Sequence, residues 1–121
     1  MTKPFVLIVE DDPLLSKIFT LALQIEFQTE AIMNGLAALT RLDEVQPDVV
    51  VLDLNLPGAP GRDILAKIRA DARLARVPVI IASADVRQAD YLREDVDIVL
   101  VKPISPVQLR ELASRLCAAK L

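Results

Sequence analysis

Residues 49–61 decide the fold, and they read Val49-Val50-Val51-Leu52-Asp53-Leu54-Asn55-Leu56-Pro57-Gly58-Ala59-Pro60-Gly61. The apolar run at 49–52 predicts a strand buried on both faces, because a strand with one solvent-facing side alternates apolar and polar residues. The segment from Pro57 to Gly61 predicts a loop, since proline and glycine interrupt regular structure. Apolar residues at 64, 65 and 68 then predict the inward face of a helix. Asp53 therefore stands at the carboxyl end of a strand in a strand–loop–helix unit.

The same unit recurs on both sides of this stretch. Short apolar runs predict further strands at residues 5–9, 29–32, 77–82 and 98–101, and the run at 29–32 is the most polar. Helices are expected to follow at N-caps Asp12, Asn34 and Ser105, and over residues 85–93. Proline follows Asp12 and Ser105 directly, as it does at many first helical positions. The expected inward residues are Leu15, Ile18, Ala22 and Ile25; Leu39, Leu42 and Val45; Val86, Ala89 and Leu92; and Leu109, Leu112 and Leu116.

These repeated units predict an α/β fold with a parallel sheet and helices on both faces, because right-handed crossovers leave few other arrangements. We expect the four strongly apolar strands to be central and the polar second strand to lie at an edge. The implied strand order is 2-1-3-4-5, that of the flavodoxin-like doubly wound (βα)5 fold. No linker, charge block or repeat divides the chain, so residues 1–121 are expected to form a single domain.

Composition and charge exclude several classes of function. The chain has 14 basic and 17 acidic side chains, a net charge of −3, and no clustered basic surface, which disfavours nucleic-acid binding. Histidine is absent, which excludes histidine-based catalysis or metal binding. Apolar runs are far shorter than the roughly 20 residues that span a bilayer. No signal peptide is recognisable, and the single cysteine, Cys117, forms no internal disulfide, so we expect a cytoplasmic protein.

Residues suited to phosphoryl transfer stand at the ends of four predicted strands. Glu10 and Asp11 follow the first strand, Asp53 the third, Ser83 the fourth and Lys102 the fifth. Each alone has an ordinary structural explanation as a turn, cap or surface residue. Parallel strands, however, bring their carboxyl ends to one edge of the sheet, where ligands bind in such folds. The coincidence of all these residues predicts a site there.

The residue types indicate the chemistry. Converging carboxylates repel one another and favour a divalent cation, and Mg²⁺ prefers oxygen ligands. A carboxylate is also able to act as a nucleophile and form an aspartyl-phosphate. The transferring phosphoryl group carries charge on three oxygens, which Mg²⁺, the Lys102 ammonium and the Ser83 hydroxyl would stabilise. The sequence therefore predicts Mg²⁺-dependent phosphoryl transfer.

From Phe5 to about Leu116 the sequence resembles the receiver domain of two-component response regulators. The matching segments are 7–12 (LIVEDD), 51–57 (VLDLNLP) with Gly61, 80–84 (IIASA) and 101–103 (VKP). The resemblance implies that a histidine kinase or a histidine phosphotransfer protein phosphorylates Asp53, and that the domain acts on a downstream protein or output domain. It implies that Ser83 turns toward the phosphoryl group, that Lys102 binds it, and that the 102–103 peptide is cis.

The resemblance also implies the ligands of the metal. Asp11 would bind Mg²⁺ directly with Asp53, while Glu10 would act through water. Asn55 would offer its backbone carbonyl. Departures from the family lie on the output side. Val99 stands where an aromatic residue is usual, Pro60 stands where an acidic residue is common, and residues 95–97 replace a Gly-Ala-Asp-like segment. We expect these changes to affect coupling to the output rather than phosphorylation.

Three alternatives remain open at this stage. A pseudo-receiver would keep the fold as a phosphate-independent interaction module, but it would normally have lost one site residue. A small phosphatase would need a second acid two residues after Asp53, where Asn55 stands. A flavin-binding domain would need a glycine-rich loop after the first strand. We therefore expect a phosphoacceptor, not a turnover enzyme, existing as a monomer or weak dimer, either alone or as part of a longer protein.

Overall fold

The computed structural model describes residues 3–119. Its strands are β1 (Phe5–Val9), β2 (Gln28–Ile32), β3 (Val49–Leu52), β4 (Val79–Ser83) and β5 (Ile98–Val101). Its helices are α1 (Pro13–Leu23), α2 (Gly35–Leu42), α3 (Gly61–Ala70), α4 (Val86–Tyr91) and α5 (Pro106–Ala119), with a 3₁₀ turn, η1, at Arg93–Asp95. Strands and helices alternate along the chain as predicted.

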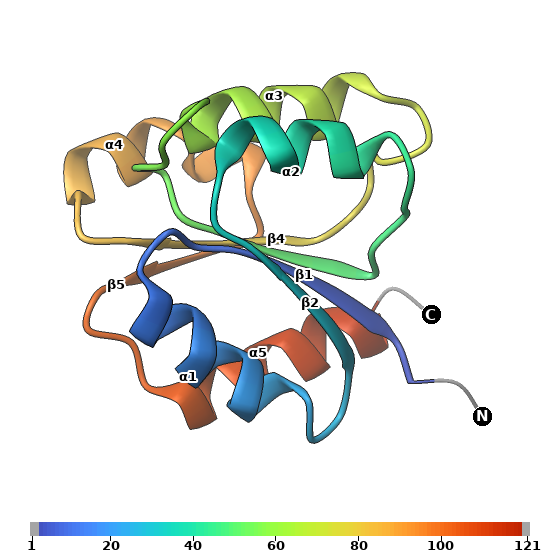
Figure 1. Ribbon diagram of the computed structural model, residues 1–121, viewed down its shortest axis with the longest axis vertical. Helices are drawn as coiled ribbons and strands as arrows, with labels where there is room; N and C mark the ends of the chain where they lie inside the picture. Colours follow the sequence, from blue (N-terminus) through green and yellow to red (C-terminus); the bar gives the residue numbers. More distant parts are fainter. Residues whose placement is uncertain (1–2, 120–121) are drawn as a thin grey trace.

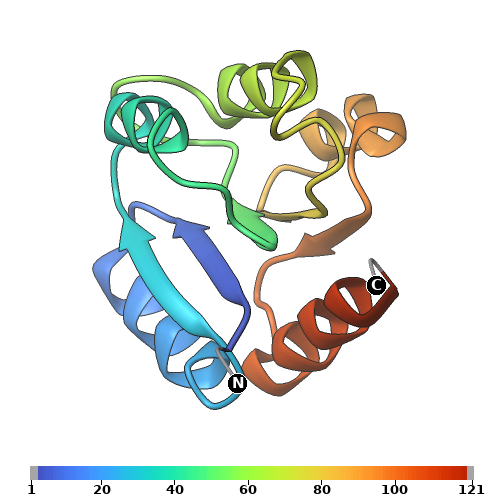
Figure 2. The ribbon, with the colours of Figure 1, turned by 90° about the vertical axis from the view of Figure 1, so that its right-hand side faces the viewer.

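The strands form one parallel sheet in the order β2-β1-β3-β4-β5, which confirms the predicted topology. Helices α2, α3 and α4 cover one face of the sheet, and α1 and α5 cover the other (Figure 1). Figure 2 shows the same two helical layers from the side. One expectation was wrong: the fifth strand is not central. It forms the edge opposite β2, and its residues are half-buried or exposed.

The central strands are apolar at every position because each face of the sheet has its own core. In β1, Leu7 and Val9 point into the core under α2 and α3, whereas Val6 and Ile8 point into the core over α1 and α5. Side chains alternate across a strand, so both sets must be apolar. All four residues are fully buried, as the sequence predicted for a strand covered on both faces.

Side-chain caps fix where the helices begin. The Asp12 carboxylate accepts hydrogen bonds from the backbone of Leu14 and Leu15 at 2.9 and 3.2 Å. The Asn34 side-chain oxygen caps α2, and the Ser105 hydroxyl accepts a bond from the Gln108 backbone N–H at 3.2 Å. These caps satisfy backbone donors that the first helical turn leaves unpaired. The predicted starts of α1, α2 and α5 are therefore confirmed.

Some predicted helix faces and boundaries were wrong. Helix α1 ends at Leu23, so Ile25 lies beyond it and is 60% exposed; its buried residues are Ser16, Phe19 and Leu23. Val45 likewise lies beyond the end of α2. Strand β4 begins at residue 79 rather than 77, and α4 has six residues, of which Ala89 alone is buried. Periodicity continued past the true ends because the next loops also carry apolar residues. Within residues 3–119, no helix is long and apolar enough to cross a bilayer.

Candidate functional site

The carboxyl ends of β1 and β3 bring three carboxylates together. Glu10 and Asp11 follow β1, and Asp53 follows β3, whose register aligns Val9 with Leu52. One oxygen from each carboxylate lies within 4.8 Å of the other two. Glu10 and Asp53 are buried and Asp11 is exposed, so the cluster opens to solvent on the side of Asp11.

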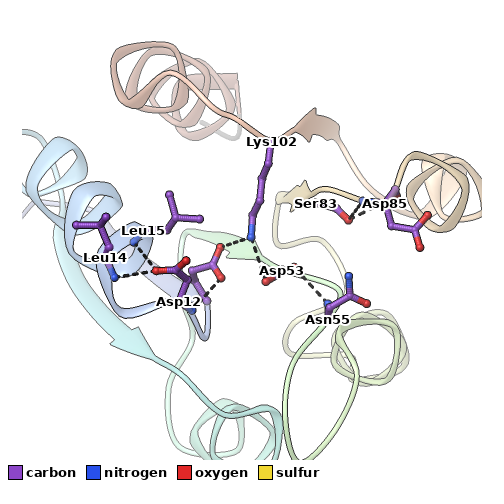
Figure 3. Close-up of polar contacts among 9 residues, drawn as sticks. Asp12, Leu14, Leu15, Asp53, Asn55, Ser83, Asp85 and Lys102 are labelled. Carbon is purple, nitrogen blue, oxygen red and sulfur yellow. Dashed lines mark hydrogen bonds and ion pairs between the residues drawn. The ribbon is translucent and has the colours of Figure 1, made fainter.

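Backbone and side-chain contacts hold Asp53 in place. Its N–H donates to the Val9 carbonyl at 2.9 Å, which fixes the residue to the end of β1. Its Oδ1 accepts a hydrogen bond from the Asn55 N–H at 3.2 Å, which sets the first turn of the loop that follows (Figure 3). Asp53 is 4% exposed, so few orientations of its carboxylate are available. The remaining oxygen, Oδ2, faces Lys102.

Lys102 reaches the carboxylates from the end of the edge strand β5. Its Nζ lies 3.2 Å from Asp53 Oδ2 (Figure 3) and 2.8 Å from Glu10 Oε1. Its backbone N–H donates to the Ser83 carbonyl at 2.8 Å, and the Lys102–Pro103 peptide is cis, as the resemblance implied. One ammonium thus contacts two buried carboxylates, and the site carries a net negative charge once all three carboxylates ionise.

Burial raises the pKa of the Glu10 carboxyl from 4.5 to about 7, the nearby Asp53 adds to the rise, and Lys102 opposes it. Burial on its own would lower the pKa of Lys102, but the pairs with Glu10 and Asp53 outweigh it and raise that pKa. Lys102 therefore stays charged, while Glu10 titrates close to neutral pH.

Both oxygens of the Glu10 carboxylate have a partner. Its Oε2 accepts a hydrogen bond from the Asp12 N–H at 3.2 Å. Its Oε1 is buried and forms the 2.8 Å ion pair with the Lys102 ammonium, a cation that it shares with Asp53. Buried oxygens normally have a hydrogen-bond donor or cation to satisfy them. With Asp11 and Asp53 beside it, this donor set fits an oxygen-binding cation such as Mg²⁺.

Ser83 lies at the same edge but faces elsewhere. Its hydroxyl oxygen accepts a hydrogen bond from the Asp85 N–H at 3.0 Å, and Figure 3 shows it turned toward Asp85. In the part of the chain that the structure describes, no hydrogen bond joins the Ser83 side chain to Asp53 or Lys102. The structure thus brings together Glu10, Asp11, Asp53 and Lys102, and it leaves Ser83 beside them.

Sequence reasoning assigned nothing to the edge strand β2, yet its end adjoins the site. The Ile32 carbonyl accepts a hydrogen bond from the Glu10 N–H at 3.0 Å. Two further residues were also missed: Asp97 accepts the Val79 N–H at 2.8 Å, and Arg69 donates to the Val77 carbonyl at 2.7 Å. The Asn34-Gly35 pair indicates a turn after β2, but it does not specify the backbone contact between Ile32 and Glu10.

Comparison with known proteins agrees with this geometry. A family model described as the response regulator receiver domain matches residues 6–114. The DNA-binding response regulator MtrA of Mycolicibacterium smegmatis is 38% identical over 108 residues, covering 86% of this chain and 46% of that protein. The sensor histidine kinase TmoS of Ectopseudomonas mendocina is 30% identical over 122 residues, covering 98% of this chain and 12% of that protein. The chain thus spans about half the length of the MtrA regulators that it matches.

Solved structures agree on the fold. The Francisella response regulator 1452 receiver domain superposes with a TM-score of 0.87 at 25% identity, covering 98% of this chain and all of that one. The receiver domain of the Pseudomonas aeruginosa sensor histidine kinase PA1611 also has a TM-score of 0.87, at 24% identity, covering 97% of this chain and 99% of that one. The latter structure has a magnesium ion coordinated in its active site cleft.

Proposed function

The chain belongs to the response regulator receiver domain family of two-component signalling, and from this premise we propose that it accepts a phosphoryl group on Asp53 in a Mg²⁺-dependent reaction. The donor would be a histidine kinase or a histidine phosphotransfer protein. The observation that carries the proposal is the buried Asp53 carboxylate, 3.2 Å from the Lys102 ammonium and clustered with Glu10 and Asp11.

Asp53 is the nucleophile in this proposal. One of its carboxylate oxygens bonds to phosphorus while the N–P bond of the donor phosphohistidine breaks, and that bond's electron pair stays on the donor nitrogen. The Asn55 N–H and the Val9 carbonyl hold Asp53 in a fixed orientation for attack. The Lys102 ammonium offsets charge on the incoming phosphoryl oxygens, because it is already directed at the Asp53 carboxylate.

The carboxylates of Asp11 and Asp53 and the backbone carbonyl of Asn55 would hold Mg²⁺ directly, with Glu10 contributing through water. When bound, Mg²⁺ supplies positive charge opposite the phosphoryl oxygens. Two observations support this donor set: the three carboxylates lie within 4.8 Å of one another, and the Lys102 ammonium offsets only one of their three charges.

Phosphorylation would then bias a two-state loop. The Ser83 hydroxyl would exchange its bond with the Asp85 N–H for one with the phosphoryl group, next to the start of α4. Residues 1–121 would act as a single domain in the cytoplasm, as a monomer or weak dimer. They would assist their own phosphorylation and dephosphorylation without turning over a substrate, and they would signal to a downstream protein or output domain.

The decisive experiment incubates the protein with Mg²⁺ and acetyl phosphate and measures its intact mass. We expect the parent to gain one phosphoryl group and the Asp53→Asn variant to gain none. Omitting Mg²⁺ should abolish the gain in the parent. If the parent gains no mass and binds no Mg²⁺, the proposal fails and the chain is a phosphate-independent interaction module. Equal gain in parent and variant would place the modification elsewhere.

A further inference from the structure

The end of β2 and the start of α2 contact both loops that carry the acidic residues. On one side, the Ile32 carbonyl accepts the Glu10 N–H at 3.0 Å. On the other, the Gly35 N–H donates to the Pro57 carbonyl at 2.8 Å. Figure 1 shows the turn between β2 and α2 beside the loop that joins β3 to α3. A segment with no functional side chain of its own thus connects the Glu10–Asp11 turn to the loop that follows Asp53.

The contact between the turn and the loop leaves no space for a larger residue. A Cβ added at Gly35 would lie 2.7 and 2.8 Å from the backbone carbon and nitrogen of Ala59, and closer still to its oxygen. Gly58 has a φ of +85°, and a Cβ there would lie 2.6 Å from Asn34 Oδ1. The two glycines let two backbones approach at this point. The loop therefore rests directly on the start of α2.

Asn34 and the first turn of α2, on which the loop rests, are themselves fixed in place. Asn34 Oδ1 accepts the backbone N–H groups of Leu36 and Ala37 at 2.8 and 3.2 Å, which ties its side chain to the first turn of α2. Helix α2 is anchored in turn by Ala38 and Leu42, both fully buried. The face that contacts Gly58 and Ala59 is therefore fixed by the helix and its core.

The loop at residues 54–61 is short, and backbone hydrogen bonds join its two ends. A displacement of one residue in it would therefore move the others. The Gly61 N–H donates to the Leu54 carbonyl at 2.9 Å, and the Ala59 N–H to the Pro57 carbonyl at 3.1 Å. Asn55 lies inside this closed loop, next to Asp53. A shift of Pro57 or Ala59 would therefore move the Asn55 backbone relative to the Glu10–Asp11 turn.

We propose that Asn34 and Gly35 are positioning residues that hold the 54–61 loop at the separation from the Glu10–Asp11 turn that Mg²⁺ binding requires. The proposal rests on the proposed function, because it assumes that Mg²⁺ binds between these two loops. Neither residue touches the carboxylates. Both act by fixing backbone that carries a ligand, as outer contacts do at other metal sites.

The test substitutes Gly35→Ala and measures the Mg²⁺ dissociation constant by titration calorimetry. We expect a dissociation constant raised roughly tenfold, in the range seen when outer contacts of metal sites are removed. In the metal-free protein, amide hydrogen exchange should quicken for residues 54–61 and stay unchanged in α5. This second readout does not depend on metal or on phosphorylation.

The matched control is Thr40→Gly, which weakens the same helix at an exposed position beyond the turn that Asn34 caps. It should lower the urea midpoint while leaving the Mg²⁺ dissociation constant unchanged. If Gly35→Ala does not fold, Gly58→Ala tests the same contact from the loop side, where the expected results are the same. Its left-handed backbone position is strained by alanine, so its Mg²⁺ affinity is again compared with that of the control.

The outcomes separate this proposal from the proposed function. A parent that binds no Mg²⁺ refutes the proposed function and, with it, the metal-positioning role. A parent that binds Mg²⁺ while Gly35→Ala and Gly58→Ala bind it equally well, after losing stability like the control, overturns the positioning role alone. Weakened binding in both glycine variants, with unchanged binding in Thr40→Gly, supports it.

Discussion

The two edge strands of the sheet serve the site in opposite ways. Strand β2 is polar and half-exposed, and it contributes backbone: a carbonyl to Glu10 and, through the turn after it, an N–H to Pro57. Strand β5 is apolar but also half-exposed, and it contributes a side chain, Lys102. Backbone support is fixed by the helix behind it, whereas the Lys102 side chain depends on β5 keeping its place. The comparison predicts that the backbone at the β2 edge is held more rigidly than the backbone at the β5 edge.

The edges are also tied down differently. Arg41 of α2 pairs with Glu30 of β2 through two hydrogen bonds, at 2.8 and 3.0 Å, between half-exposed side chains. Arg69 of α3 instead donates to the carbonyls of Val77 and Asp95, at 2.7 and 2.8 Å, next to β5. Helix α4, which should cover β5, has one buried residue. Ile98, Val99 and Leu100 of β5 pack against the two cores, but the segment that leads into β5 is held by the polar contacts of Arg69, where β2 has the longer helix α2 behind it.

The largest effect is expected from Lys102→Met, which removes the contribution of β5 to the site. Glu10 and Asp53 would be left buried beside each other without their counter-charge, at a cost of about 3 kcal/mol in the free energy of unfolding. Urea denaturation of the metal-free protein at pH 8 measures it. The loss should shrink at pH 5, because Glu10 is then protonated.

The control for that substitution is Lys67→Met. Lys67 pairs with Asp43 at 2.5 Å, but the Asp43 side chain is 65% exposed. Pairs of this kind contribute at most about 1 kcal/mol. Equal losses in the two methionine variants would contradict the view that β5 stabilises the site through a buried ion pair.

The next effect concerns Glu10, which has contacts from both edges. The Ile32 carbonyl of β2 accepts its backbone N–H, and Lys102, which follows β5, pairs with its carboxylate. The pKa of the Glu10 carboxyl is raised from 4.5 to about 7, so the folded protein binds this proton more tightly than the unfolded chain does. The contribution of this group to stability is therefore complete below pH 4.5 and is lost as the pH rises to about 7. We expect metal-free stability to fall by on the order of 2 kcal/mol across that range.

The Glu10→Gln variant should lack most of this pH dependence, since glutamine does not titrate. Urea midpoints from pH 4.5 to 8, measured with a chelator present, provide the comparison. The same slope in parent and variant would show that another group is responsible.

Sequence alone predicted the centre of the molecule better than its edges. The runs at 5–9 and 49–52 identified β1 and β3, because burial on both faces forces apolar residues at every position. The proximity of Glu10, Asp53 and Lys102 was predicted for the same reason, since each follows an apolar run. The expectation that all four apolar strands are central was wrong for β5, which the predicted order itself puts at an edge. This strand is apolar because Ile98, Val99 and Leu100 pack against the two cores.

What the sequence did not predict depends on backbone geometry or on distance along the chain. The Gly35–Pro57 contact has no side-chain chemistry to recognise. The Arg69–Asp97 pair joins residues 28 apart. The rotamer of Ser83, turned toward Asp85, is set by a loop whose path the sequence does not specify. The roles of all the predicted site residues stay predictions until phosphorylation and Mg²⁺ binding are measured; these residues are Glu10, Asp11, Asp53, Asn55, Ser83 and Lys102.

A smaller effect is expected from Arg69→Met, which removes the polar contacts beside β5 and keeps most of the side-chain length. Its partners include the carbonyls of Ala75 and Val77, which would lose their donor, at a cost of about 1 to 2 kcal/mol. Amide hydrogen exchange should quicken in residues 95–101 and stay unchanged in β1 and β2. If hydrogen exchange quickened equally in all five strands, β5 would be held no less rigidly than the other strands.

The smallest effect is expected at the β2 edge, from the pair formed by Arg41 and Glu30. A double-mutant cycle of Arg41→Ala and Glu30→Ala should give a coupling of about 0.5 kcal/mol, because both side chains are more than 30% exposed and water screens the pair. The cycle is read from urea midpoints at low and high salt, and the coupling should fall with salt. A coupling as large as the loss in Arg69→Met would mean that β2 also depends on polar contacts. Polar contacts would then hold both edges to a similar degree, and the predicted difference between β2 and β5 would not exist.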